Sequence, residues 1–388
     1  MAAFPYYDTP AIAALNDQAV AILKCFAKHG YTRQEPSILQ PADIFLDRSG
    51  EEIRRRTFTL TDPSGRELCL RPDLTIPICK TVVDSKAKLP ARVCYNGLAF
   101  RHQPNEPHSP TQFFQAGAEL LGLEDRAAGD NEILSLTVET VRAAGLTDFD
   151  LTVGDLAFFG ALVDALDVPP HWRARLKRHF WRAGYFEELL QRLTHGGPAE
   201  QKSLLASLAG LDHTGARKIV ENRLATAGHA PQGLRTLDEI VERLMEQAAD
   251  EEASHLDEHI VRVITGLLNV SGPARAALAE IRTLTKKAGI DLGKPVQAME
   301  ARLDALQALG IDPARVTFAA HFGRNMEYYT GFVFELWSRN RAGPVEIAGG
   351  GRYDTLLEAI GAGASIPAVG VAIWTETLLA ARRAAGGA

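Results

Sequence analysis

The sequence predicts an α+β fold in which an antiparallel sheet flanked by helices is interrupted by a mostly helical insertion. Strand-like runs separated by turn signals occupy residues 1–154 and return in residues 312–388. Between them, residues 155–311 are rich in Ala, Leu, Arg and Glu at helical spacing, and no strand pattern is convincing there. A chain of 388 residues can bury a core for one large domain with such an insertion.

The elements of the first segment follow from local patterns. Residues 11–30 carry an apolar stripe that ends at a glycine, as is typical of a helix. Residues 57–61 and 67–70 predict a hairpin around Asp-Pro-Ser-Gly. Residues 93–101 and 112–121 predict a second antiparallel pair joined by a loop with three prolines, and residues 149–153 predict a further strand.

The second segment repeats these signals. Strands are expected at residues 316–320, 331–337, 345–348 and 368–374. Three consecutive glycines follow the third of these runs, and a helix is expected at residues 353–361. A last helix is expected before the Gly-Gly-Ala tail.

Composition and charge exclude several classes of protein. Apolar residues make up 46% and charged residues 23%, the mix of a globular protein. The net charge is -6, and the longest basic run is only Arg54–Arg56, so nucleic acid is not expected as the main partner. No signal-peptide pattern and no apolar run of about 18 residues occurs, so neither export nor a membrane partner is expected.

The four cysteines do not form a metal-binding pattern. Cys25, Cys69, Cys79 and Cys94 include no C-x-x-C pair, and no histidine cluster accompanies them. We therefore expect no metal and no cofactor, and we expect reduced thiols in a cytoplasmic protein.

Polar residues alternate along the second strand of the 93–121 pair. Gln115, Gly117 and Glu119 share one face of that strand, where a Gln and a Glu can bind an amine and an imidazole. Arg101, at the end of the preceding strand, can clamp a carboxylate or a phosphate. Taken alone, the pair is equally compatible with a hairpin that has a solvated polar face.

Two later segments are also unusual. Residues 324–335 place an Arg and a Tyr pair before a strand, which offers aromatic walls with polar tips or ordinary strand packing. Residues 348–354 read Ala-Gly-Gly-Gly-Arg-Tyr-Asp, where glycines let a backbone approach a ligand or simply form a turn.

Together these segments closely resemble the histidyl-tRNA synthetase family of class II aminoacyl-tRNA synthetases. Phe100-Arg101-His102 and the stretch 112–119 are similar to that family's F-R-H and Q-F-H-Q-x-G-x-E, with equal loop length. Residues 324–329 and 349–354 are similar to its R-G-L-D-Y-Y and A-G-G-R-Y-D, and residues 70–75 to its L-R-P-E-G-T. The resemblance covers residues 5–154 and 312–380 and implies a class II synthetase-like fold.

The resemblance also implies a histidine site. Asp73, Thr75 and Gln115 would hold the α-amino group, and Glu119 and Tyr329 would bind the imidazole. Arg324 would face the carboxylate. The remaining candidates for histidine binding are Arg101, Tyr328 and Gly350.

Departures from the synthetase pattern concern ATP and tRNA. Positions where the family carries a Glu and two arginines on its ATP loop hold Gln103, Ser109 and Thr111, and a third arginine position holds Thr377. Each such donor is worth about 3 kcal/mol to a transferring phosphoryl group. Trp374 stands at a small-residue position beside this site. About eleven residues follow Thr377, so an anticodon-binding domain is not expected.

A synthetase-like chain of this kind resembles the family of regulatory subunits of short-form ATP phosphoribosyltransferase. The resemblance implies a non-catalytic chain required for the first step of histidine biosynthesis and for feedback inhibition, with L-histidine as effector. It implies a catalytic transferase subunit as partner, in a hetero-octamer around a synthetase-like homodimer. The chain shows no phosphoribosyl-pyrophosphate loop.

Two alternatives remain open at this stage. In the first, the chain is a truncated histidyl-tRNA synthetase-like enzyme that activates histidine with ATP. In the second, it is a structural protein that binds a tRNA-like RNA. The lost arginines oppose the first alternative, and the acidic charge opposes the second.

Overall fold

A computed structural model describes most of the chain. It describes residues 7–46, 50–102, 110–180, 183–195, 199–226, 236–252, 256–323, 328–340 and 343–386. The chain divides into two compact units, one made of residues 1–165 and 266–388 and the other of residues 166–265.

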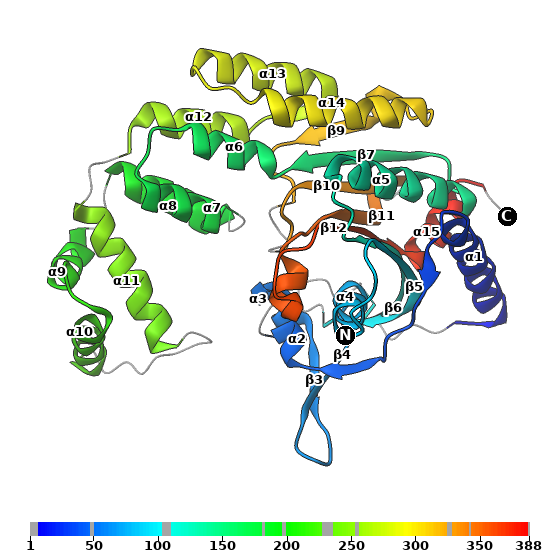
Figure 1. Cartoon of the computed structure of the whole chain (residues 1–388), viewed down its shortest axis with the longest axis horizontal. Coiled ribbons are helices and arrows are strands. Elements are labelled where there is room, and N and C mark those ends of the chain that lie inside the picture. Colours follow the sequence, from blue (N-terminus) through cyan, green and yellow to red (C-terminus); the bar gives the residue numbers. More distant parts are fainter. Residues whose placement is uncertain are drawn as a thin grey trace. The chain divides into compact units, whose positions relative to one another are not determined.

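The first unit contains a nine-stranded sheet in the order β1-β5-β6-β12-β11-β10-β7-β9-β8 (Figure 1). Pairing is antiparallel except between β1 and β5 and between β7 and β9. The strands are β1 Thr32–Arg33, β5 Ala91–Phe100, β6 Gln112–Leu121, β7 Phe149–Asp155, β8 Ser271–Pro273, β9 Val316–Ala319, β10 Phe332–Asn340, β11 Gly343–Arg352 and β12 Ala368–Trp374. The α+β class expected from the sequence is confirmed.

Helices α1 (Thr9–Lys28), α5 (Arg126–Ala143) and α15 (Thr375–Ala384) lie together on one side of the sheet (Figure 1). Asp8 caps α1 and Asp125 caps α5 through side-chain hydrogen bonds to backbone N–H groups, which fixes where these helices begin.

The other face carries the candidate site. Here α4 (Thr75–Asp84) and a small sheet of β2 (Leu39–Pro41), β4 (Glu67–Leu70) and β3 (Phe58–Thr61) pack into one hydrophobic cluster with the large sheet. The predicted hairpin is confirmed, with Thr61 opposite Glu67. Short helices α2 (Asp43–Leu46) and α3 (Gly50–Arg56) precede it.

A buried ion network ties the sheet to its helices. Asp130 on α5 accepts hydrogen bonds from Arg352 on β11 (2.8 Å) and from Arg302 (2.5 Å). Arg302 lies on α14 (Gly293–Ala308) and also donates to Asp155 at the end of β7 (3.0 Å). Because both arginines are compensated, the network joins four elements without leaving a buried charge unpaired.

The second unit is helical. It contains α7 (Pro170–His179), α8 (Ala183–His195), α9 (Ala199–Leu208), α10 (His213–Thr226) and α11 (Leu237–Glu252). Leu205, Leu208, Val220 and Val241 form a small core between the last three of these helices. Helix α12 (Glu258–Leu268) crosses the boundary at residue 266.

The compact helical unit is smaller than the expected insertion of residues 155–311. Helix α6 (Ala157–Ala165) belongs to the first unit, as do β8, α13 (Ala274–Lys287) and α14. The reason is sheet pairing: β8 hydrogen-bonds to β9, and α13 packs on both strands. The three-residue β8 was not expected, since Ser-Gly-Pro carries no strand pattern. The expected helix at 353–361 is also shorter, a helical turn around residues 358–362.

Among the described helices, none combines the length and the apolar character needed to cross a bilayer.

Candidate functional site

The candidate site lies on a face of the large sheet where glycines leave space above the strands. Glu119 on β6 stands directly opposite Gly370 on β12, and Gly370 pairs in turn with Gly351 on β11. A Cβ on Gly370 would come within 1.6 Å of the Glu119 Oε2 atom. Only glycine therefore leaves room for the Glu119 carboxylate above the neighbouring strand.

Glu119 is the buried centre of the site, with 1% of its surface exposed. Its Oε1 accepts a hydrogen bond from the Tyr95 hydroxyl (3.1 Å), and its Oε2 accepts one from Tyr353. Burial raises the pKa of Glu119 to about 7, although the hydroxyls of Tyr353, Thr75 and Tyr95 stabilise the charged form. The carboxyl can therefore both accept and exchange a proton near neutral pH.

The start of α4 brings a second carboxylate to this site. Asp73 Oδ1 accepts from the backbone N–H of Ile76 (3.2 Å), and burial raises the pKa of Asp73 while Arg101 opposes the rise. The Thr75 hydroxyl lies 3.3 Å from the Tyr95 hydroxyl. Gln115 Oε1 accepts from the backbone N–H of Leu74 (3.1 Å), which ties β6 to the start of the helix.

The predicted residues Asp73, Thr75, Gln115 and Glu119 therefore come together. The alternation on β6 is as expected: a Cβ on Gly117 would meet the Tyr95 ring, so Gly117 faces the same side as Glu119. The pair of strands is thus more than a solvated hairpin, because Gln115 and Glu119 are both buried.

Arg101 lies at the edge of this cluster. Its Nε donates to the carbonyl of Pro72 (2.8 Å), and its guanidinium lies over the Phe113 ring at 5.2 Å. Burial raises the pKa of Asp73 and of Glu346, and the charge of Arg101 opposes both rises. These contacts orient Arg101 between two carboxyls.

Tyr328 and Tyr329 line the site from the segment before β10. Their ring centroids are 4.9 Å apart, and Tyr328 also meets Tyr353 edge-on at 5.9 Å. A Cβ on Gly351 would lie 2.9 Å from the Tyr329 ring. Arg324, which the resemblance assigns to the carboxylate, lies outside the described residues.

Gly350 does not share the face of Glu119. A Cβ on Gly350 would meet the Phe334 ring at 2.8 Å, whereas Gly349 and Gly351 point to the site. Successive residues of a strand face opposite sides of the sheet, so Gly349 and Gly351 face the site while Gly350 faces away from it.

An acidic pair borders the site on the side of β10 and β11. A Cβ on Gly349 would contact Glu346, Glu335 and the Trp374 indole. Burial raises the pKa of Glu335 to about 7 and that of Glu346 to about 8, and repulsion by Glu335 adds to the rise at Glu346. Trp374 and two carboxyls thus cover the sheet where the resemblance places the nucleotide.

The positions expected to have lost ATP contacts are partly described. Gln103 and Ser109 lie outside the described residues, while Thr111 is buried. Thr377 lies in the first turn of α15. Next to it, Glu376 accepts two hydrogen bonds from the backbone N–H of Phe114 (2.8 and 3.0 Å), so this helix start supports β6.

The sequence reasoning missed four residues of this site. Tyr95 and Tyr353 hold Glu119, and Glu335 and Glu346 form the acidic pair. The signal for Tyr95 was its place in the predicted strand pair, since it stands opposite Gly117. Tyr353 was part of the Gly-Gly-Gly-Arg-Tyr-Asp run, but its direction depends on the turn after β11.

Comparisons with known proteins identify the family of the chain. A family model described as histidyl-tRNA synthetase matches residues 8–255 and 238–378. The chain is 36% identical over 353 residues to the ATP phosphoribosyltransferase regulatory subunit of Brucella anthropi, a match covering 89% of this chain and 91% of that protein. The Brucella canis protein of the same name is 36% identical over 351 residues, 89% of this chain and 92% of that protein.

Solved structures share the fold. A Bacillus halodurans protein described as an ATP phosphoribosyltransferase regulatory subunit/histidyl-tRNA synthetase superposes with a TM-score of 0.66 at 23% identity, over 98% of this chain and 82% of that one. A histidine–tRNA ligase subunit of Alicyclobacillus acidocaldarius gives 0.59 at 24% identity, over 99% and 96%. On its sequence match and its synthetase-like sheet, the chain belongs to the family of ATP phosphoribosyltransferase regulatory subunits.

Proposed function

We propose that this chain is the non-catalytic regulatory subunit of an ATP phosphoribosyltransferase, that it binds L-histidine at Glu119, and that it transmits feedback inhibition to a catalytic subunit. The observation that carries the proposal is the buried Glu119, which is held by two tyrosine hydroxyls above a glycine floor. Family membership supports the same role.

The chemistry of the site suits histidine. The imidazole of histidine presents one hydrogen-bond donor and one acceptor, and Glu119 and the surrounding tyrosine hydroxyls can form hydrogen bonds with both. The ammonium group of histidine needs acceptors, and the Asp73 carboxylate and the Thr75 hydroxyl lie at the start of α4. Arg324 is the proposed partner of the carboxylate, by resemblance. Arg101, Gln115, Tyr328 and Tyr329 would orient these groups.

The absence of adenylation activity is part of the proposal. A triphosphate carries about four negative charges and needs cationic donors. Thr111 and Thr377 stand at two of the lost arginine positions, and Glu335 and Glu346 lie with Trp374 around Gly349. Carboxylates repel phosphates, so these residues oppose ATP chemistry.

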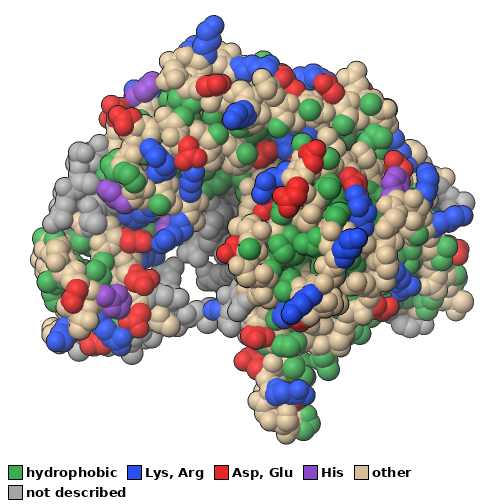
Figure 2. Space-filling model, viewed as in Figure 1, with side chains coloured by type: hydrophobic (Ala, Val, Ile, Leu, Met, Phe, Trp, Pro, Cys, Tyr) green, Lys and Arg blue, Asp and Glu red, His purple; other side chains and the backbone are tan. Residues whose placement is uncertain are grey.

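The proposed partner is the short-form catalytic transferase, which carries the phosphoribosyl transfer itself. We propose a homodimeric core within a hetero-octamer, in the cytoplasm, where the four free cysteines remain reduced. In the face that Figure 2 shows, acidic and basic side chains of the described residues are interspersed without a continuous basic field. Such a surface does not favour a nucleic acid partner.

Calorimetry of the purified chain with L-histidine and, separately, with ATP tests this function. We expect histidine to bind with one site per chain and ATP not to bind. Histamine, which lacks the carboxylate, should bind more weakly than histidine if the proposed Arg324 contact exists. Histidine-dependent exchange between ATP and pyrophosphate would instead establish the truncated synthetase-like enzyme.

A further inference from the structure

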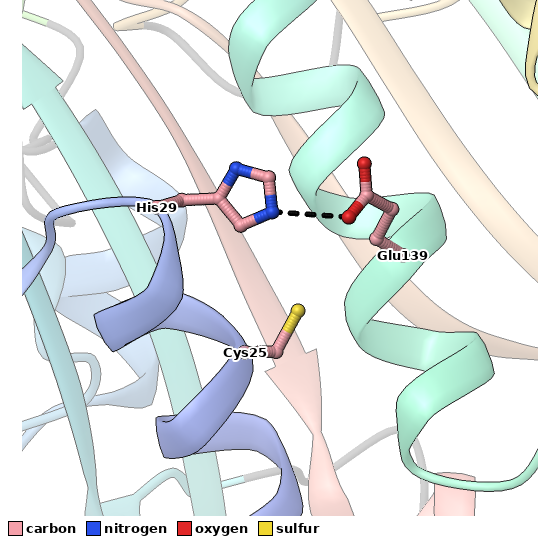
Figure 3. Close-up of side chains that lie close together, drawn as sticks. All are labelled: Cys25, His29 and Glu139. Carbon is pink, nitrogen blue, oxygen red and sulfur yellow. Dashed lines mark hydrogen bonds and ion pairs between the residues drawn. The ribbon is translucent and has the colours of Figure 1, made fainter.

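A thiol, an imidazole and a carboxylate meet where α1 packs against α5, on the side of the sheet away from the histidine site. Cys25 and His29 are four residues apart, so the helical repeat places them on one face of α1 and at its end. Glu139 reaches them from α5, as Figure 3 shows. One ligand atom from each residue lies within 4.8 Å of the others.

From this arrangement we propose a zinc site formed by Cys25, His29 and Glu139. The three side chains offer sulfur, nitrogen and oxygen, the donor set that Zn²⁺ accepts in proteins. Mg²⁺ and Ca²⁺ prefer oxygen ligands throughout, so the thiolate and imidazole select against them. Three protein ligands with water in a fourth position is a common zinc arrangement.

The contacts between the ligands are compatible with a metal-free form of this site. His29 Nε2 lies 3.0 Å from Glu139 Oε2, as in a hydrogen bond, and the Thr140 hydroxyl donates to Cys25 Sγ at 3.4 Å. Tetrahedral ligands about 2.0–2.3 Å from zinc lie about 3.3–3.8 Å apart. Binding therefore requires Glu139 and His29 to separate slightly and Cys25 to approach, which are side-chain movements.

Exposure leaves the site open to an ion from solvent. The side chains of His29 and Glu139 are 30% and 35% exposed, and Cys25 is partly exposed, whereas Cys69, Cys79 and Cys94 are buried. The nearby carboxylate of Glu132 is already held by Arg92 (2.7 Å at both oxygens) and by Tyr31 (2.8 Å). This leaves water as the expected fourth ligand.

The sequence predicts no metal by the usual patterns, because it contains no C-x-x-C pair and no histidine cluster. Here the spacing is Cys-x-x-x-His along one helix, and the third ligand lies more than a hundred residues later. The physical consequence of binding would be a link between the C-terminal end of α1 and the C-terminal part of α5. The inference is independent of histidine binding, since it involves none of the residues of that site.

Titration of the tag-free, chelator-treated chain with Co²⁺ tests this site, with Zn²⁺ as competitor. We expect one Co²⁺ per chain, a thiolate-to-cobalt charge-transfer absorption, and loss of that absorption when Zn²⁺ is added. Zn²⁺ should also raise the melting temperature, because it binds only the folded arrangement.

Matched variants distinguish this site from adventitious binding. Cys25→Ser should abolish the charge-transfer absorption, and His29→Gln and Glu139→Gln should each weaken Zn²⁺ binding by more than the ~10–100-fold that outer-shell partners contribute. His213→Gln, which removes another contact between a histidine and a carboxylate (His213 with Asp238, 3.8 Å), should change neither. The melting temperature of each variant without metal checks folding. Absence of Co²⁺ binding, or binding that survives Cys25→Ser and His29→Gln in folded protein, would overturn the proposal.

Discussion

At the residue scale, the proposed histidine site depends on the contacts that hold the Glu119 carboxylate. This carboxylate is buried, accepts from Tyr95 and Tyr353, and lies over Gly370. A ligand that donates an N–H to this group gains a charge-assisted hydrogen bond in a region without water competition. The same burial raises the pKa of Glu119 to about 7, so the group is poised between its two protonation states.

Replacing Glu119 by glutamine should weaken histidine binding by about 2 kcal/mol, roughly 30-fold, because a neutral amide is a poorer acceptor than a carboxylate. The amide keeps the shape of the side chain, so the fold should persist. Calorimetry measures the affinity, with the exposed Glu35→Gln as the control. Unchanged affinity in the Glu119 variant would remove the residue from the site.

Replacing Gly370 by alanine should disturb Glu119 directly. The added methyl group would lie 1.6 Å from Oε2, so either the carboxylate or β12 must move. We expect a loss of about 1–3 kcal/mol in the free energy of unfolding and a large loss of histidine affinity. Gly160→Ala on α6, where nothing lies within 4 Å, is the matched control and should be neutral or slightly stabilising. Equal effects of the two variants in chemical denaturation would contradict this account.

Site residues could be predicted from the sequence only where a local rule fixes the direction of the side chain. Gln115, Gly117 and Glu119 could be assigned to one face because strand alternation is a local rule. Tyr353 and Glu346 could not, because a turn and a register shift between β10 and β11 set their directions. Gly350 was misplaced by one residue of the same alternation.

At the scale of elements, the acidic pair on β10 and β11 makes stability depend on pH. Folding raises the pKa of Glu335 to about 7 and of Glu346 to about 8. Above an ordinary pKa of 4.5, the folded chain therefore holds protons that the unfolded chain has released. The contribution of this pair to the free energy of unfolding should be highest near pH 5 and should fall as the pH rises from about 5 to about 8.

Glu346→Gln should remove much of this dependence. The remaining carboxyl of Glu335 loses its charged neighbour and ionises more easily, so the single variant should act on both groups. We expect an increase of about 1–3 kcal/mol in the free energy of unfolding at pH 8.5 and a smaller one at pH 5.5. Urea unfolding at the two pH values measures it, and an equal change at both would contradict the burial argument.

The stability of the fold should depend strongly on the buried ion network around Asp130, which connects helices to the sheet. Asp130→Ala would leave Arg302 and Arg352 without their shared carboxylate, at a cost of about 3–5 kcal/mol. Asp304→Ala, which breaks the exposed pair with Arg275, should cost less than about 1 kcal/mol. Thermal unfolding compares the two variants, and similar melting temperatures would refute a buried structural role for the network.

Prediction of the elements succeeded where the sequence carries a local pattern and failed where it does not. Seven of the nine strands of the large sheet alternate or carry long apolar runs and were placed within a few residues, whereas the two-residue β1 was not anticipated. Helix α5 was not anticipated, because Ile133, Leu136 and Val138 point in different directions and all are buried, which removes the apolar stripe. The short β8 depends on its partner β9 and has no local signal.

At the scale of the whole molecule, a chain with a synthetase-like sheet belongs to the family of ATP phosphoribosyltransferase regulatory subunits. Family and fold were recognisable from motifs far apart in the sequence, and the structure brings residues 70–75, 112–119 and 349–354 together.

The most direct test is the activity of the catalytic transferase reconstituted with this chain. Phosphoribosyl transfer to ATP should require the chain and should be inhibited by L-histidine. With Glu119→Gln in its place, activity should persist while inhibition shifts to about 30-fold higher histidine. A transferase that is equally active without this chain, or equally inhibited with wild type and Glu119→Gln, would contradict the regulatory role assigned to the site.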